Sequence, residues 1–252
     1  FTKSSRDSDQ TGLMAKTIPS KAFILAAGLG SRLRPYTDNV PKPLVSVRDR
    51  TLLDRTLDHL HALGLKDVVL NTHYLADHIK QAMVNRPEFN TAISYEEELL
   101  DTGGGIKNTI THFDDAFYVL SGDGLWENTP NQNTLENMAK QWDSKTMDIL
   151  ILLQPVSTMA LTKGVGDYTL DEEGIPIRSL DKTGEYMFTS MRINHPRIFN
   201  NAPEGAFSYR DLMDQAQDKG RLHAIIHDGD WHHISTPEDL EKVNAAYKEW
   251  GR

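Results

Sequence analysis

The sequence predicts an α/β fold in which a mostly parallel β-sheet carries helices on both faces. Through the first half of the chain, short apolar segments typical of buried strands alternate with segments whose apolar residues recur at helical spacing. Such alternation is typical of parallel sheets, because a helix carries the chain back between neighbouring strands. The 252 residues contain no internal repeat and no low-complexity linker, so we expect a single domain over 21–252 after a disordered extension over 1–20.

The first half supplies the elements of this expected sheet. Lys21–Ala26 is a short apolar strand, and Asp67–Asn71 contains three consecutive aliphatic residues typical of a buried strand. Leucines at helical spacing predict a helix over Leu52–Leu63 that ends at Gly64. The same patterns predict strands at Ala92–Tyr95, Ala116–Leu120 and Asp148–Leu153, helices at Leu75–Val84 and Thr134–Trp142, and a helix that opens at Gly105–Ile110.

The second half is richer in strand patterns and less regular, and we expect it to form one wall of a cleft. Its strand patterns are bounded by glycine and acidic turn residues. The predicted elements are strands at Gly166–Leu170, Ile175–Leu180 and Glu185–Ile193, with a turn around 172–174, and helices at Tyr209–Gln217 and Pro237–Trp250.

The composition excludes several classes of protein. The chain has no cysteine, which excludes disulfides, thiolate catalysis and cysteine-based zinc sites and fits a cytoplasmic location. The formal net charge of -9 disfavours a general nucleic-acid binder, although Arg32, Arg34 and Lys42 supply a local basic pocket for one nucleotide. No apolar run reaches the roughly 18 residues that span a membrane. The acidic net charge and the lack of such a run lead us to expect neither nucleic acid nor membrane among the partners.

A loop rich in glycine and basic residues follows the first strand. Gly28 and Gly30 stand at alternate positions, where glycine lets backbone N–H groups approach a ligand closely. Arg32 offers a fork of donors for phosphate oxygens, and Lys42 offers a compact positive charge. Together they predict a polyphosphate pocket and transfer chemistry at a nucleoside triphosphate. The alternative is a tight turn without function. The loop is not a dinucleotide-binding fingerprint, because Leu33 stands where that motif has its third glycine, and it lacks the Gly-Lys-Ser/Thr ending of a Walker motif.

A single aspartate, Asp123, stands just after the Ala116–Leu120 strand. Because ligands of open α/β sheets bind at the carboxyl ends of the strands, we expect Asp123 and the Gly28 loop to meet at one site. Aspartate is also common in turns and at helix N-termini. Its place at the sheet edge favours a ligand for Mg²⁺, which binds hard oxygens from carboxylates and substrate phosphates.

Longer motifs resemble one known family. One motif resembles the signature of the sugar-1-phosphate nucleotidyltransferases. It is Gly28-x-Gly30-x-Arg32 followed by Pro35, Thr37 and Pro41-Lys42-Pro43. Segments 100–106, 121–123 and 231–240 resemble further parts of that family in family order, and the matches span Lys21 to about Tyr247. The short chain and its Thr-Gly-Gly-Gly-Ile run are most similar to the short bacterial enzymes that join UTP to N-acetylmuramate 1-phosphate in cell-wall recycling. Short mannose-1-phosphate guanylyltransferases share most of these motifs.

The resemblance implies a Rossmann-like, single-domain nucleotidyltransferase fold. It implies a nucleoside triphosphate and a sugar 1-phosphate as substrates and Mg²⁺, or alternatively Mn²⁺, as cofactor, while the choice between a monomer and a small homo-oligomer stays open. The catalytic residues implied are Arg32, Lys42 and Asp123, with Asp123 also binding the metal. The other residues implied are Leu25, Ala26, Ala27, Gly28, Gly30, Ser31, Arg32, Thr102, Gly103 and Gly104 for the nucleotide, and Lys163, Asp167 and Thr189 for the sugar phosphate, although Lys163 and Asp167 fit a solvated loop equally well.

His233 departs from the family pattern, in which an aspartate supplies a second carboxylate to the metal. Three interpretations remain open. The metal binds to Asp123 and phosphates alone, His233 is a ligand that shifts the preference towards Mn²⁺, or catalysis is weakened. We expect an active enzyme with an altered metal preference. Ser121 and Ser190 also depart, from asparagine and glycine, where the sugar or ribose would lie.

Other functions remain open beside this one. A non-catalytic sugar-nucleotide sensor would explain His233, but it would not need Arg32, Lys42 and Asp123 together. Transfer of CMP to phosphocholine uses the same loop, but the choline group requires an aromatic box that we do not find in the sequence. The missing third glycine argues against a dehydrogenase. The run Glu96-Glu97-Glu98 is interpreted as a solvated segment before a loop.

Overall fold

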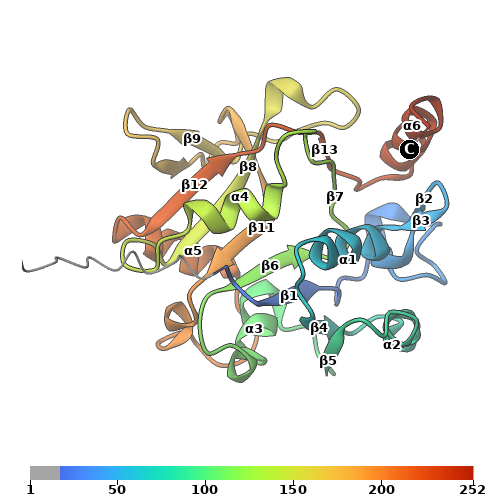
Figure 1. Ribbon diagram of the computed structural model, residues 1–252, viewed down its shortest axis with the longest axis horizontal. Coiled ribbons are helices and arrows are strands. Elements are labelled where there is room, and N and C mark those ends of the chain that lie inside the picture. The colour runs from blue at the N-terminus through green and yellow to red at the C-terminus, as the bar shows by residue number, and fades with distance from the viewer. Residues whose placement is uncertain (1–17, 252) are drawn as a thin grey trace, which may run out of the picture.

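A nine-stranded sheet forms the centre of the structure, a computed structural model that describes residues 18–251 (Figure 1). Its strands, in chain order, are β1 (Lys21–Leu25), β4 (Asp67–Thr72), β5 (Asn90–Tyr95), β6 (Phe117–Ser121), β8 (Ile149–Pro155), β9 (Tyr168–Leu170), β10 (Pro176–Arg178), β11 (Tyr186–Asn194) and β12 (Leu222–Ile226). β1 lies between β4 and β6 and is parallel to both. β5 continues the sheet parallel to β4, whereas β11 is antiparallel to β6 and to β8. The mostly parallel sheet predicted from the sequence is confirmed.

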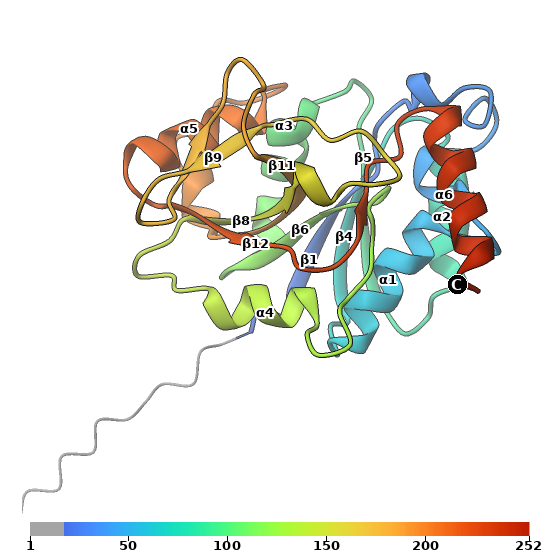
Figure 2. The ribbon, with the colours of Figure 1, turned by 90° about the horizontal axis from the view of Figure 1, so that it is seen from above.

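Helices cover both faces of this sheet, as Figure 2 shows. They are α1 (Leu52–Ala62), α2 (Ala76–Val84), α3 (Asp101–Lys107), α4 (Thr134–Gln141), α5 (Tyr209–Asp218) and α6 (Pro237–Glu249). Because side chains alternate along a strand, Ala22 and Ile24 of β1 pack in one buried cluster with α1, α2 and α4, and Phe23 packs in another with α3 and α5. α6 packs in a third cluster, against Leu33 and Val47. The prediction of helices on both faces is therefore confirmed.

The remaining elements are short. They are β2 (Ser46–Val47), β3 (Arg50–Thr51), β7 (Leu125–Trp126), β13 (Trp231–His232) and 3₁₀ helices at Ser31–Leu33, Lys42–Leu44, Ile110–His112, Val156–Thr158 and Pro196–Phe199. β7 pairs antiparallel with β13. This pairing brings the segment around His233 next to the loop that follows β6, although more than a hundred residues of chain separate the two.

Two segments differ from the sequence expectations. α3 begins at Asp101 and contains all three consecutive glycines, whereas the sequence predicts a helix that opens only at Gly105. A side chain at Gly103 or Gly104 would collide with the ring of Phe207 or the carbonyl of Gly205, so close packing maintains a helix that glycine itself disfavours. β12 has no predicted counterpart, because it is a short edge strand whose middle residues are only half-buried.

The ends of the described range bear on two other expectations. Of the extension predicted over 1–20, only residues 18–20 are described, and they form neither helix nor strand. From residue 18 to residue 251, no helix is both long enough and apolar enough to cross a membrane. α5 and α6 begin at the predicted residues, where the side chains of Ser208 and Thr236 cap their first turns.

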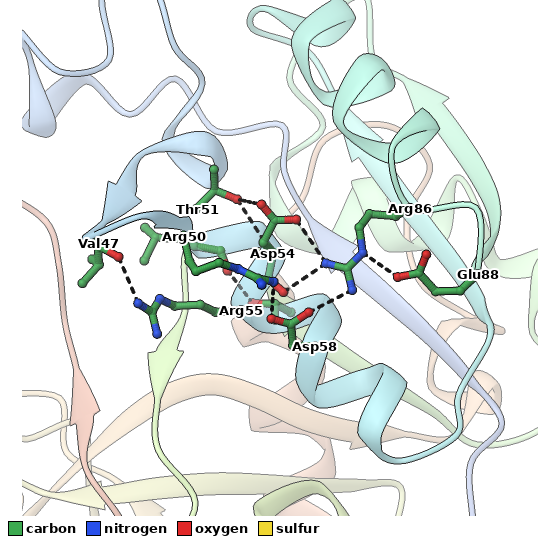
Figure 3. A network of polar contacts seen from close by, with 10 residues as sticks. Val47, Arg50, Thr51, Asp54, Arg55, Asp58, Arg86 and Glu88 are labelled. Atoms are coloured by element: carbon green, nitrogen blue, oxygen red, sulfur yellow. Dashed lines mark hydrogen bonds and ion pairs between the residues drawn. The ribbon is translucent and has the colours of Figure 1, made fainter. Parts of the chain in front are cut away.

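A network of charged side chains joins α1 to the loop after α2 (Figure 3). Arg86 lies at its centre, with a side chain that is 12% exposed. Its guanidinium donates to Asp54 Oδ1 at 3.1 Å, Asp58 Oδ1 at 3.0 Å and Glu88 Oε1 at 2.6 Å. Asp58 also pairs with Arg50. One arginine therefore connects three carboxylates from two parts of the chain.

We expect the Arg86→Ala variant to lower the Tm by roughly 2–6 °C, because three carboxylates lose their shared partner and repel one another. Water still reaches those carboxylates, which limits the loss. Thermal unfolding followed by circular dichroism measures the shift. The control is Lys242→Ala, which removes an exposed pair with Glu238 and should change the Tm by less than about 1 °C. Equal shifts in the two variants would contradict a structural role for the network.

Candidate active site

The loop after β1 is shaped by glycine. Gly30 has a φ of 64°, in the left-handed region that other residues rarely adopt. A Cβ at this position would lie 3.0 Å from Thr37 Cγ2 and 3.1 Å from Lys42 Cβ. The Thr37 hydroxyl donates to the Gly30 carbonyl at 2.8 Å and closes the loop. A Cβ at Gly28, by contrast, would meet nothing within 4 Å, so the chain leaves open space there.

Two cavities meet beside this loop. The smaller, of about 290 Å³, is lined by the loop together with Asn71, Glu96 and Leu99. The larger, of about 640 Å³, extends towards β11, α5 and β13. Residues shared by both cavities are Leu25, Lys42, Asp101, Thr102, Ser121, Asp123 and Ser190. The two cavities therefore offer room for two ligands side by side, with Lys42 and Asp123 at the junction.

Lys42 and Asp123 form an ion pair at this junction. The distance from Lys42 Nζ to Asp123 Oδ2 is 2.5 Å, and the side chains are 15% and 28% exposed. Ser121 donates a hydrogen bond to Asp123 Oδ1. The Gly122 N–H donates to the Leu25 carbonyl at 2.9 Å, which ties the end of β6 to the end of β1 and fixes the position of Asp123.

Asp123 is held in its charged form. Burial alone would raise the pKa of this carboxyl, but the Lys42 ammonium and the Ser121 hydroxyl outweigh burial and keep the pKa below its ordinary value. Asp123 therefore carries a full negative charge at neutral pH and presents carboxylate oxygens to the junction.

His233 lies on the wall of the larger cavity, just after β13. Its backbone N–H donates to Thr162 Oγ1 at 2.9 Å, and its ring stacks on Trp231 with 5.8 Å between centroids. Burial and the nearby Lys42 charge lower the pKa of the imidazole, which is therefore neutral at pH 7. A neutral imidazole can bind a metal ion through a ring nitrogen.

The donor set fits a divalent cation only in part. Within the described residues, no group of three or more His, Cys, Asp or Glu side chains could hold a metal ion by itself. Asp123 and His233 supply one carboxylate and one neutral imidazole to the same cavity. Such a pair suits a cation that takes its remaining ligands from substrate phosphates, as Mg²⁺ commonly does.

Some residues predicted to bind the nucleotide line the cavities, and others do not. Gly28, Gly30, Leu25, Ala26 and Ala27 line the smaller cavity, Thr102 lines both and Arg32 lines the larger. Ser31, Gly103 and Gly104 line neither. The N–H groups of Gly103 and Gly104 both donate to the Phe207 carbonyl, at 3.0 and 3.3 Å. These glycines lie where close helix packing requires them.

Glu96 corrects the interpretation of the acidic run. Glu96 is 2% exposed, whereas the sequence pattern predicts a solvated run. Glu96 accepts hydrogen bonds from Asn71 Nδ2 at 2.8 Å and from the Leu100 N–H at 3.0 Å. Of the three glutamates in the run, Glu97 and Glu98 are exposed and Glu96 is buried, so the pattern predicts two of the three correctly.

Two of the three residues predicted to bind the sugar phosphate line the larger cavity. Asp167 lines the larger cavity and accepts from Lys182 Nζ at 2.6 Å and from the Phe188 N–H at 3.1 Å. Thr189 lines it too, but its hydroxyl donates to the Leu152 carbonyl at 2.9 Å. Lys163 lines neither cavity.

Several residues of this cavity have no counterpart among the sequence predictions, and one of them is a buried cation. This cation, Arg192, lies on the cavity wall. The sequence signal that could have revealed it is a charge between Met191 and Ile193 in an otherwise apolar strand end.

Comparisons with known proteins add to this geometry. Residues 21–164 match the family model described as nucleotidyl transferase. The N-acetylmuramate alpha-1-phosphate uridylyltransferase of Caulobacter vibrioides is 30% identical over 238 residues, which cover 92% of this chain and 98% of the relative. The D-glycero-alpha-D-manno-heptose 1-phosphate guanylyltransferase of Campylobacter jejuni is 28% identical over 87% of this chain and 96% of the relative. The crystal structure of HddC from Yersinia pseudotuberculosis with GMP-PN shares the fold, with a TM-score of 0.72 and 24% identity over 90% of this chain and 99% of that one.

Proposed function

This chain belongs to the nucleotidyl transferase family, and on that premise we propose that it joins UTP to N-acetylmuramate 1-phosphate with release of pyrophosphate. The observation that carries the proposal is the pair of cavities that meet at Lys42 and Asp123. Two anionic substrates can lie on either side of one ion pair there. The choice of base and sugar follows the printed activity of the Caulobacter relative. Both proposed substrates are small soluble metabolites. The proposal further includes a cytoplasmic location, a monomer or small homo-oligomer, and no nucleic acid or membrane among the partners.

The reaction needs positioning and charge neutralisation more than proton transfer. The phosphate of the sugar is already ionised at neutral pH and is itself the nucleophile. One of its oxygens forms a bond to the α-phosphorus of UTP, and the bond from that phosphorus to the bridging oxygen of pyrophosphate breaks. The main barrier is the approach of one polyanion to another, which a preorganised positive charge lowers.

The described residues divide this task between them. The backbone around Gly28 and Gly30 lines the smaller cavity and would hold the triphosphate together with Arg32. Lys42 lies at the junction and would neutralise charge on the α-phosphate and the incoming sugar phosphate. The positions of both substrates are thereby fixed before the bond forms.

A divalent cation is part of the proposal, and Asp123 is the residue that would hold it, with His233 as a second ligand. When bound, such a cation neutralises phosphate charge and polarises the phosphorus–oxygen bonds. The accessible carboxylate of Asp123 and the neutral imidazole of His233 support this assignment. Mn²⁺ is the expected preferred ion, because imidazole is a better ligand for transition metals than for Mg²⁺.

We expect the His233→Asp variant to use Mg²⁺ better relative to Mn²⁺, with the ratio of the two rates rising at least about fivefold. The physical reason is that a second carboxylate oxygen replaces an imidazole nitrogen. Initial rates measured with each ion, over a range of metal concentrations, give the ratio. His233→Asn is the matched control, because it removes the imidazole without adding charge. An unchanged ratio in His233→Asp would show that His233 does not touch the metal.

The proposed reaction itself is tested by pyrophosphate release across a grid. The grid combines each common nucleoside triphosphate and dTTP with several sugar 1-phosphates and phosphocholine, with Mg²⁺ or Mn²⁺. Release that requires both UTP and N-acetylmuramate 1-phosphate supports the proposal. Release with GTP and mannose 1-phosphate, or with CTP and phosphocholine, would replace it. Nucleotide binding without release in any combination would indicate a non-catalytic sensor.

A further inference from the structure

Arg192 is a buried cation on the wall of the larger cavity. Its side chain is 2% exposed, and it lies on β11 in the middle of the sheet. A charge taken out of water costs a great deal of free energy unless a partner compensates it. Across the described part of the chain, Arg192 has no carboxylate partner. A buried charge without a carboxylate partner, beside a cavity, indicates that an anionic ligand completes the site.

Two nitrogens of the Arg192 guanidinium have no hydrogen-bond partner, and together they can donate to both oxygens of a carboxylate. Nη1 donates to the Ser190 carbonyl at 3.0 Å, while Nε and Nη2 have no hydrogen-bond partner. Nε–H and Nη2–H lie side by side on one edge of the planar guanidinium. That edge matches the two oxygens of a carboxylate in a bidentate pair.

Aromatic packing fixes the guanidinium in place. Its central carbon lies 3.8 Å from the centroid of the Tyr209 ring and 5.9 Å from that of Phe188. The Tyr209 hydroxyl donates to Asn194 Oδ1 at 2.6 Å, so the ring beneath Arg192 is itself held. The stacking offsets part of the cost of burial and leaves the buried Nε–Nη2 edge without a hydrogen-bond partner. A preorganised fork loses little entropy when it binds an anion.

The position of Arg192 separates it from the reacting phosphate. Lys42 and Asp123 line both cavities, whereas Arg192 lines the larger one alone. A sugar phosphate that attacks UTP lies at the junction. Arg32 also lines only the larger cavity, but it belongs to the loop after β1 that would hold the triphosphate. Arg192 lies on β11, away from that loop, and therefore faces the sugar part of the acceptor. Six residues that line the larger cavity are basic and three are acidic, although the whole chain is acidic. This excess of positive charge suits an acceptor with an anionic group besides its phosphate.

We propose that Arg192 binds a carboxylate carried by the acceptor sugar and thereby makes the enzyme selective for acidic sugar 1-phosphates. The inference rests on the proposed function, because it assigns the sugar to the larger cavity. The carboxylate can come from a lactyl ether on the ring, as in N-acetylmuramate, or from an oxidised C6, as in a uronic acid. Both present the same group to the fork, and matched acceptor pairs tell them apart.

The test compares acceptors that differ by one carboxylate. N-acetylmuramate 1-phosphate is paired with N-acetylglucosamine 1-phosphate, and glucuronate 1-phosphate with glucose 1-phosphate. The readout is the ratio of kcat/KM within each pair, measured by pyrophosphate release. We expect the acidic member of one pair to be preferred by the natural chain, and Arg192→Gln to lower that preference about 100-fold. Arg192→Lys, which keeps the charge without the fork, should recover only part of it.

Arg210→Gln is the control, because Arg210 is an exposed cation on the same cavity. It should change the ratio by less than about threefold if the fork, and not the overall charge, recognises the carboxylate. A natural enzyme that does not discriminate within either pair would overturn the inference. So would a loss in Arg192→Gln that is equal for both acceptors, which a purely structural arginine would cause.

A binding measurement separates this inference from the proposed reaction. Calorimetric titration of the natural chain with UDP-N-acetylmuramate, UDP-N-acetylglucosamine, UDP-glucuronate and UDP-glucose requires no turnover and no variant. If no acceptor gives pyrophosphate, the proposed function fails. Tighter binding of the acidic nucleotide sugar of either pair would still support the carboxylate site. Equal binding within both pairs would refute it even where turnover is normal.

Discussion

Replacing Lys42 with alanine is expected to lower kcat at least about 100-fold, comparable to the loss of one preorganised charge-stabilising donor. Lys42 is the cation that lines both cavities at their junction, 2.5 Å from Asp123. Its removal takes away positive charge where two phosphates must approach, and it also leaves the Asp123 carboxylate facing them unpaired. Because that carboxylate then repels both substrates, the loss includes a repulsive part. Pyrophosphate release with both substrates saturating measures kcat directly.

Two further variants define what the Lys42 result means. Lys42→Arg keeps the charge but changes its shape, so it should recover part of the activity. Lys242→Ala removes a lysine from an exposed pair on α6, and its kcat should stay within about twofold of the natural chain. Turnover of Lys42→Ala within about threefold of the natural value, in a variant shown by circular dichroism to be folded, would refute the assignment.

Replacing Asp123 with alanine should lower kcat about 1,000-fold and remove the dependence of the reaction on the divalent ion. Asp123 supplies a carboxylate at the junction beside Lys42, held charged by Lys42 and Ser121. Without it, a cation has His233 as its remaining protein ligand in the proposed site, and Lys42 loses the partner that fixes its position. Rates measured over a range of Mg²⁺ and Mn²⁺ concentrations report the metal dependence.

The control for Asp123 is the isosteric Asp123→Asn. It keeps the size and a hydrogen-bond acceptor for Ser121 but loses the charge, so a metal role predicts a loss nearly as large as that of alanine. Titration of UTP binding with and without the metal provides a readout apart from turnover. If the metal concentration for half-maximal rate in either variant equals that of the natural chain, Asp123 is not the ligand.

Local patterns in the sequence are sufficient to predict the main sheet and the glycine-containing loop after β1. Four apolar residues in a row, 22–25, form most of β1, and Ser208 and Thr236 are capping residues that mark where α5 and α6 begin. Gly28 and Gly30 predict a loop whose backbone can approach a ligand closely. These features depend on neighbours in the chain, so a short window of sequence encodes them.

Local patterns were misleading where distant segments determine the environment. The sequence predicts a helix that opens only at Gly105, yet α3 begins at Asp101, because the segment 205–207 packs against Gly103 and Gly104. Glu96 belongs to an acidic run that predicts exposure, yet Asn71 from β4 and the Leu100 N–H hold it in the interior. In both cases the free energy of a contact far along the chain outweighs the local preference.

The sequence by itself determined the family, the mostly parallel sheet with helices on both faces and the residues that could hold a polyphosphate, because each depends on residues close together in the chain or on their types. Only the tertiary structure decided that Lys42 pairs with Asp123 at the junction of two cavities, and that Arg192 lies unpaired on the wall of one of them. Those facts depend on how β11, α5 and the β7–β13 pair pack around the strand ends. Such packing joins segments far apart in the chain, and burial and charge compensation can be judged only once those segments are in contact.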